Sequence, residues 1–366
     1  MNRNTPHIPP WARTALMTLT VMGAACGGSD GSNLSGPDGD QLCSLPQELL
    51  WASLPPDAIP ALTLPEMVTA DDPGADFLFD SDRVLGIVVN GEARAYPHNI
   101  LWWHEIINDR IGETWVSVTF CPLTGSGLAF DPTLNGNRLD LGVSGLLFAN
   151  NLVMFDRRSG AVFGPQLFSE GKCATFRSAR LKVVPVQEMS WSRWRELHPD
   201  TKVVSGQTGF SRNYRQYPYG SYRELNNGDL LFPMTVDRTR PIKERVLAIR
   251  TSETAGRGYP FGELSKMGDR VALNETVDGA PVTVFYESAE GESAMAYDPT
   301  VDGQLLTFEA DGEFYRDAET GSLWTLSGKA VSGSLAGRTL RPIADSWVVF
   351  WFAWKHFLPD GKTFTT

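Results

Sequence analysis

"RVLGIVVNGEARAYP", residues 83–97, contains two alternating apolar runs separated by Asn90-Gly91. Asn-Gly between such runs is the strongest short signal for a β-hairpin, because both residues tolerate the positive φ angles of a two-residue turn. A second hairpin is expected further along the chain, at Asn135-Gly136 in "GLAFDPTLNGNRLDLGV". The sequence therefore predicts a mainly β (α+β) fold made of antiparallel strands.

The same blocks recur later in the chain and in the same order. "RVLGI" at 83 returns as "RVLAI" at 245, "ARAYP" at 93 as "GRGYP" at 256, and "AFDP" at 129 as "AYDP" at 296. Repetition in a fixed order indicates a duplicated structural unit. We expect two tandem copies of an antiparallel β unit with a few short helices, at residues 76–205 and 240–366, joined by a connector at 206–239.

Two short helices are expected in the first copy. "PHNILWWHEIIN" (97–108) has Pro97 in its first turn, and "SWSRWREL" (190–197) has Ser190 as a plausible N-cap. On the first helix, His104 shares one face with three apolar residues, so its imidazole is expected to point toward the core.

The first 25 residues have the layout of an export signal. Two arginines precede an apolar run that ends at Ala25, and the run is too short to span a bilayer permanently. Cys26 follows and begins a Gly- and Ser-rich stretch to residue 40, which has the composition of a flexible tether. The expectation is an exported cell-envelope lipoprotein, periplasmic or surface-facing, with a lipid on Cys26 as its membrane anchor.

Charge and cysteine content limit the function further. The formal charge is −11 and no run of Lys or Arg occurs, which excludes the phosphate-neutralising surface of a nucleic-acid-binding protein. With Cys26 lipidated, three cysteines remain in an oxidising compartment, so at most one pair can form. Cys43 and Cys173 both lie in loop-like sequence, and a bridge between them is the first choice. Cys121 is then a free thiol.

Cys121 ends a predicted strand and is followed by the small-residue loop "PLTGSG". Cys121 is thus a thiol beside free loop amides, and His104 lies one turn and one strand away. Three hypotheses follow for this pair. The pair could bind a soft transition metal such as copper or a small ligand, since such metals favour thiolate and imidazole. Cys121 could instead be a nucleophile with His104 as base and Glu105 as orienter, giving a hydrolase or acyltransferase. Both residues could also simply fill the core of a structural module.

The chain from "GEARAYPHNILWWHEIINDRIGETWVSVTFCPLTGSGLAFD" through "HPDTKVVSGQTGFSRNYRQYPYGSY" to "FWFAWKHFLPDGK" resembles the bacterial family called DUF3179. The motifs of the resemblance are Arg94-x-Tyr96-Pro97, His104-Glu105, Asn108-Asp109, and Cys121-Pro122-Leu123 followed by Cys or Thr. This chain has Thr124 there, so a cysteine pair is not available. The resemblance implies an exported protein and no particular reaction.

The leading hypothesis is an exported, lipid-anchored protein of unknown biochemical role, whose first repeat binds a soft metal or small ligand through Cys121 and His104. Asn108 and Thr124 are candidate ligand-binding residues beside them. In the second copy the position of Cys121 is Glu287, and no histidine occurs in the matching helix. One copy is therefore expected to carry chemistry while the other keeps only the shape.

Overall fold

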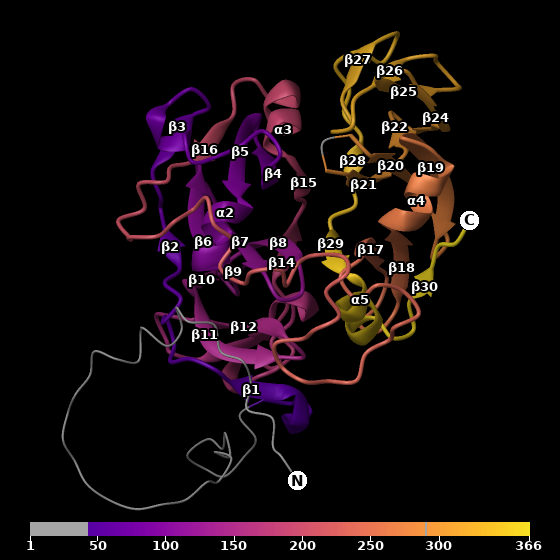
Figure 1. Ribbon diagram of the computed structural model, residues 1–366. Coiled ribbons are helices and arrows are strands. Elements are labelled where there is room, and N and C mark those ends of the chain that lie inside the picture. Colours follow the sequence, from indigo (N-terminus) through magenta and orange to yellow (C-terminus); the bar gives the residue numbers. More distant parts are fainter. Residues whose placement is uncertain (1–42, 290) are drawn as a thin grey trace, which may run out of the picture.

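The computed structural model describes residues 43–366 except residue 290 (Figure 1). The predicted export signal, tether and lipidated Cys26 lie outside the described residues. The fold is mainly β with several antiparallel sheets, as predicted. None of the helices in residues 43–366 outside residue 290 is long and apolar enough to cross a membrane.

The first repeat is centred on the predicted hairpin of β4 (Arg83–Val89) and β5 (Glu92–Pro97). Asn90 and Gly91 adopt φ angles of 51° and 84°, as the two-residue turn requires. The hairpin lies in a sheet of order β15-β4-β5-β16-β3. The other members are β15 (Gln187–Ser190), β16 (Lys202–Val204) and β3 (Met67–Thr69).

Two further sheets complete the first repeat. One has the order β14-β8-β7-β6-β2 and comprises β14 (Lys182–Val184), β8 (Ser126–Asp131), β7 (Thr114–Cys121), β6 (Ile106–Ile111) and β2 (Leu62–Thr63). The other has the order β1-β11-β12-β13 and comprises β1 (Leu50–Ala52), β11 (Leu141–Phe148), β12 (Asn151–Asp156) and β13 (Val162–Pro165). β9 (Thr133–Leu134) and β10 (Asn137–Arg138) form the second predicted hairpin.

The second repeat has its own set of sheets. The first sheet, β29-β17-β18-β30, comprises Ser346–Phe350, Arg245–Arg250, Gly256–Pro260 and Lys362–Thr363. The second, β19-β20-β21-β28, comprises Arg270–Val277, Ala280–Glu287, Ser293–Asp298 and Arg341–Pro342. The third, β24-β25-β26-β27, comprises Phe308–Asp311, Phe314–Asp317, Leu323–Trp324 and Ala330–Ser332, and β22 (Thr300–Val301) pairs with β23 (Gln304–Leu305).

The two repeats share the order and register of their strands. Val84 pairs with Pro97 in the first hairpin, and Val246 pairs with Pro260 in its counterpart. The strand β16 runs parallel to β5, just as β30 runs parallel to β18. Figure 1 shows the repeats side by side and inverted, with β11 and β12 at the bottom of the first and β24 to β27 at the top of the second. The residue boundaries of the two copies stay a prediction.

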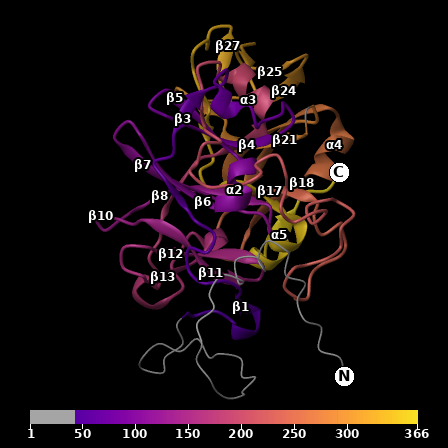
Figure 2. The same ribbon diagram turned by 60° about the vertical axis from the view of Figure 1, so that its left-hand side comes forward.

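Three strands of the first repeat precede the predicted boundary at residue 76. β1, β2 and β3 add an edge strand to each of its three sheets, and the connector 206–239 contains neither a helix nor a strand. The repeats contact each other through β15 and β21 and through β29 and β8 (Figures 1 and 2). Their apolar cores are also shared, because one cluster joins Cys121 to Phe350 and Trp354.

The helices are short and occupy equivalent places in the two repeats. α2 (His98–His104) and α4 (Phe261–Met267) follow the hairpins, while α3 (Trp191–Leu197) and α5 (Trp351–Phe357) follow β15 and β29. Ser190 caps α3 as predicted, since its side chain accepts a hydrogen bond from the backbone N–H of Arg193 at 3.2 Å.

The predicted helix over 97–108 is too long at its C-terminal end. α2 stops at His104, and residues 106–111 form β6, which pairs with β7 along its whole length. Two β-branched residues, Ile106 and Ile107, favour the strand once Glu105 has broken the helix with a positive φ angle of 54°.

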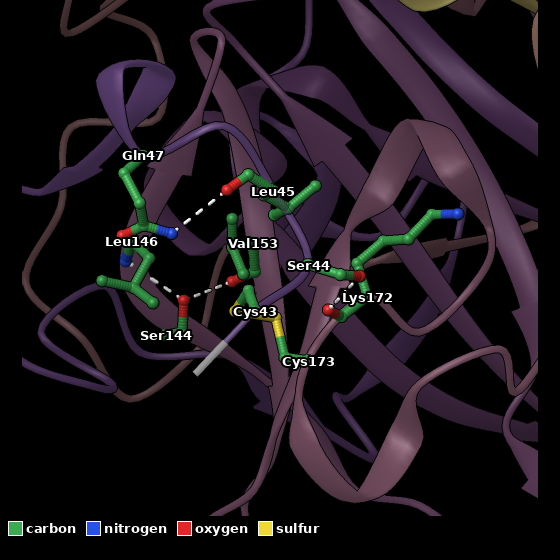
Figure 3. Close-up of a disulfide and its surroundings, with 9 residues drawn as sticks. All are labelled: Cys43, Ser44, Leu45, Gln47, Ser144, Leu146, Val153, Lys172 and Cys173. Atoms are coloured by element: carbon green, nitrogen blue, oxygen red, sulfur yellow. Dashed lines mark hydrogen bonds between the residues drawn. A yellow bond between two sulfur atoms is a disulfide. The ribbon is translucent and has the colours of Figure 1, made fainter. Parts of the chain in front are cut away.

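Cys43 and Cys173 form a disulfide, which is the pairing expected from the sequence (Figure 3). Their Cα atoms lie 3.8 Å apart, and both side chains are fully buried. The next residue, Ser44, donates its backbone N–H to the carbonyl of Lys172 at 2.7 Å. The bridge therefore ties the start of the described chain to the loop after β13.

Candidate functional site

His104 is a buried, fully hydrogen-bonded residue at the end of α2. Its Nδ1 lies 2.7 Å from the carbonyl of Pro60, and its Nε2 lies 2.7 Å from the hydroxyl of Tyr214. Since a carbonyl only accepts, Nδ1 carries the proton, and Tyr214 donates to Nε2. Burial lowers the pKa of His104 to about 4, so the ring is neutral at physiological pH. Both ring nitrogens are thus already occupied.

Cys121 is the free thiol that the sequence predicted, and it is buried at the end of β7. Its Sγ donates to the carbonyl of Asn150 at 3.4 Å. Burial, reinforced by the carboxyl of Glu105, raises the pKa of the thiol to about 11. A thiol that stays protonated at neutral pH is a poor nucleophile and a poor metal ligand.

Glu105 has the most unusual backbone of the predicted site residues. It follows α2 with a φ of 54°, a conformation that costs a non-glycine residue roughly 1 kcal/mol. Its backbone carbonyl accepts from the N–H of Phe120 at 2.8 Å and so ties the helix end to β7. Burial raises the pKa of its carboxyl to about 8, so the group is largely protonated at neutral pH.

Asn108 and Thr124 belong to buried polar networks within the first repeat. Asn108 donates its side-chain N–H to the carbonyl of Leu141 at 2.8 Å and accepts from the hydroxyl of Ser117 at 2.6 Å. The hydroxyl of Thr124 lies 2.9 Å from that of Ser126. The side chain of Asn151 on β12 donates to the hydroxyl of Thr124 at 3.0 Å, so Asn108 and Thr124 each link two neighbouring sheets of the first repeat.

The structure does not join His104 and Cys121 by a hydrogen bond, because each has separate partners. Within residues 43–366 apart from residue 290, no group of three or more His, Cys, Asp or Glu side chains is arranged to hold a metal ion. Metal binding by Cys121 and His104 stays a prediction.

A cleft of about 930 Å³ lies between the two repeats. A volume in this range is typical of sites for small molecules. The first repeat contributes Arg83, His98, Trp102, Phe120 and Glu188, the connector contributes Tyr217 and Arg223, and the second repeat contributes Lys243, Arg245, Phe261 and Phe350. Phe120 and Pro122 line the cleft on either side of Cys121, which lies behind the wall.

His98 and Glu188 are two of the buried polar residues of the cleft wall. Each side chain is about 5% exposed, and neither His98 Nε2 nor Glu188 Oε2 has a hydrogen-bond partner among the described residues. Nε2 lies 4.0 Å from Glu188 Oε1, too far for a direct hydrogen bond. Burial lowers the pKa of His98 to about 3, so the ring is neutral and Nε2 can bond a polar group in the cleft.

Arg83 and Arg245 occupy equivalent positions in the repeated blocks and converge at the cleft. Arg83 donates to Glu188 Oε1 at 2.8 Å and to the carbonyl of Gly291 at 2.7 Å. Arg245 donates to the same Gly291 carbonyl at 2.8 Å and to Glu292 Oε2 at 2.9 Å. Burial opposes the ionisation of Glu188, but the two guanidinium groups outweigh it and lower its pKa. The carboxylate is therefore ionised.

Sequence reasoning did not select the residues of the cleft. Two signals were present: Arg83 and Arg245 each begin a repeated block, and His98 follows the first "YP" where Phe261 follows the second. The wall of the cleft thus contains an arginine that is the same in both copies and a histidine that occurs in the first copy alone. Neither signal reveals that the two copies face each other across an opening.

The fold and the cleft define a class of protein: a tandem β repeat with a binding-sized opening between its copies. The chain belongs to the family described as "Protein of unknown function (DUF3179)", whose model matches residues 56–361. The resemblance seen in the sequence is thus confirmed, and one family unit spans both repeats and the connector. No curated protein and no solved structure was found to match the chain.

Proposed function

We propose that this protein is an exported binding protein for a small polar molecule, which enters the cleft between the repeats and touches both. The observation that carries the proposal is the pair of buried atoms without partners, His98 Nε2 and Glu188 Oε2, in the wall of a 930 Å³ opening. A buried polar atom without a partner costs roughly 1–3 kcal/mol, and a bound donor would recover much of it.

The remainder of the wall supports a small-molecule site over a protein-binding surface. Five aromatic rings line the cleft together with several charged groups. Most small-molecule sites combine apolar surface with a few oriented polar groups in this way. Glu188 is ionised and held between two arginines, so its carboxylate can accept a hydrogen bond from a hydroxyl or N–H of a ligand.

Native mass spectrometry tests the proposal. Protein purified gently from the cell envelope should carry a small molecule that is released on denaturation. H98F should reduce its occupancy at least about tenfold, because Phe removes the polar atom and the loss of one buried hydrogen bond is worth about 1.4 kcal/mol or more. Phe already stands at the equivalent position, Phe261, so the substitution suits the fold.

H198F is the matched control. His198 also has a buried Nε2 without a partner among the described residues. Burial is the main reason that its pKa is lowered to about 4. Its ring packs against Trp194, and it does not line the cleft. H198F should leave occupancy unchanged. A protein without any bound molecule, or equal loss in both variants, would contradict a ligand site in the cleft.

We also propose export and lipidation at Cys26. The layout of residues 1–26 supports this, and the Cys43–Cys173 disulfide is of the kind that persists in oxidising compartments. Mass analysis of the mature N-terminus should find a lipid-modified Cys26. C26S should release the protein from the membrane fraction, and an unprocessed N-terminus would contradict the proposal.

A further inference from the structure

We propose that Lys243 is a nucleophilic lysine that forms an imine with a small carbonyl compound bearing an acidic group. This inference rests on the proposed ligand cleft and names the class of molecule that occupies it. The first observation is placement: Lys243 lines the cleft just before β17 and is only 2% exposed. Lysine is rarely buried so completely unless it is paired with a charge.

Lys243 has aromatic neighbours in place of a carboxylate. Its Nζ lies 3.2 Å from the ring centroid of Tyr222, 5.2 Å from that of Phe352 and 5.7 Å from that of Phe350. Its one hydrogen bond in the described structure goes to the carbonyl of Asp229 at 2.9 Å. Four other cations of the cleft, Arg83, Arg240, Arg245 and Lys266, each have a carboxylate partner.

This environment favours the neutral amine. Burial lowers the pKa of Lys243 to about 7, although the nearby charge of Asp229 opposes the shift. Desolvation in an apolar pocket is the usual way in which proteins activate lysine as a nucleophile. A hydrogen bond to the carbonyl of Asp229 could equally be made by an arginine. Lysine differs from arginine in that burial can make it neutral and therefore nucleophilic.

Arg223 is the group that would bind the acidic part of the ligand. Its guanidinium carbon lies 4.6 Å from the ring centroids of both Trp102 and Tyr217, which hold it against the cleft wall. No carboxylate forms an ion pair with Arg223 within residues 43–366 apart from residue 290. A fixed guanidinium without an acidic partner suits a ligand carboxylate, which it can bind with two hydrogen bonds.

The chemistry needs no other reactant. The lone pair of Lys243 Nζ attacks the carbonyl carbon and forms a C–N bond, while the carbonyl π electrons move to oxygen. The resulting carbinolamine loses that oxygen as water together with the two amine protons. A C=N bond to Nζ remains. The step is reversible, and hydride reduction converts the imine into a stable secondary amine.

Reductive trapping tests the inference. The full-length protein is incubated at neutral pH with glyoxylate and cyanoborohydride, and peptide mass spectrometry locates the carboxymethyl groups. Lys243 should be labelled at least about tenfold faster than the exposed Lys266 of the same cleft, because its amine is neutral at this pH. Acetaldehyde, which lacks the acidic group, should label Lys243 more slowly than glyoxylate does.

Two variants complete the test. K243R keeps a hydrogen-bond donor for the carbonyl of Asp229 but forms no imine, so the fast label should disappear, and thermal unfolding checks that the variant is folded. R223Q should remove the preference for glyoxylate over acetaldehyde. Equal labelling of all lysines, or no label on Lys243, would overturn the inference. If the cleft still bound a small molecule in native mass spectrometry, the proposed function would stand without the imine.

Discussion

The two repeats share a backbone plan but differ in how they satisfy their buried polar positions. In the second repeat Glu287 lies between Arg193 at 2.9 Å and Arg270 at 2.9 Å, and a glycine follows the helix. In the first repeat Cys121 lies beside a protonated Glu105, which follows the helix with a strained backbone. Glu287 is therefore paired with one arginine from each repeat, Arg193 of the first and Arg270 of the second. Glu105 of the first repeat is buried without an ion pair in the described structure.

The comparison separates positions that maintain the shared fold from positions that differ between the two copies. Positions that only maintain the sheets have the same chemistry in both copies: Arg94 and Tyr96 bind Asp109, and Arg257 and Tyr259 bind Glu275. At the cleft, Arg83 and Arg245 are also alike, but His98 of the first copy is replaced by Phe261 in the second. Four predictions test the comparison.

The largest effect is expected when the first repeat receives the residue of the second. C121E would bury a carboxylate beside Glu105 and the carbonyl of Asn150, without the two arginines that accompany Glu287. We expect a loss of about 3–5 kcal/mol in the free energy of unfolding, as for an unpaired buried charge. Urea denaturation measures the loss. C121A is the control for lost packing, and a C121E protein as stable as C121A would remove the distinction between the repeats.

The next effect depends on pH and tests the buried Glu105. Its folded-state pKa of about 8 exceeds its ordinary 4.5, so between these values the folded state holds a proton that the unfolded state has lost. Stability from this group is complete below pH 4.5 and is lost as the pH rises to 8. E105Q has no such titration and should exceed the wild type by about 4 kcal/mol at pH 8.

Urea denaturation at pH 5 and pH 8 checks this prediction. The difference between E105Q and the wild type should widen as the pH rises. The matched variant E275Q alters an acidic residue on a strand of the second repeat and should show no such widening. A constant difference across this range would mean that Glu105 is ionised in the folded protein.

The paired networks of the two repeats should differ in strength because they differ in exposure. The Arg94–Asp109 side chains are 10% and 3% exposed, whereas those of Arg257–Glu275 are 24% and 18% exposed. D109N should cost about 2–3 kcal/mol of unfolding free energy and E275Q about 1 kcal/mol. Chemical denaturation of both variants at pH 7 gives the ratio. Equal losses of unfolding free energy would show that the deeper burial of the Arg94–Asp109 pair does not make it more stabilising than the Arg257–Glu275 pair.

The sequence was informative where the signal was local. The hairpin at Asn90-Gly91, the cap at Ser190 and the repeated blocks each depend on a few neighbouring residues, and the fold followed from them. The end of α2 was missed because the break depends on Glu105 adopting a positive φ angle, which its residue type does not favour. The Cys43–Cys173 pairing was predicted from the loop-like sequence around both cysteines.

The candidate site was harder to predict because it is built across the repeats. His104 and Cys121 are close in sequence and on adjacent elements, yet each side chain turns to its own partners, Tyr214 and Asn150. Conversely, Arg83 and Glu188 meet on neighbouring strands of the first repeat, and Arg245 joins them only when the two copies fold together. Local pattern gives the elements of this protein, whereas the cleft depends on the tertiary arrangement.

The smallest expected effect concerns His98, the cleft residue whose counterpart is Phe261. Its pKa of about 3 lies below the ordinary 6.5, so below pH 6.5 the unfolded state gains a proton that the folded state cannot. Stability from the neutral ring is therefore complete above pH 6.5 and declines as the pH falls. H98F lacks this penalty and should exceed the wild type by about 1–2 kcal/mol at pH 5 but by less at pH 7.5.

Thermal unfolding of H98F and the wild type at the two pH values measures this difference, which has the opposite pH dependence to that of E105Q. A variant that is more stable and yet loses the bound molecule would show that His98 is retained in the first repeat at the expense of stability. If H98F were less stable than the wild type at both pH values, His98 would instead be a packing residue, and the cleft would lose its main support as a binding site.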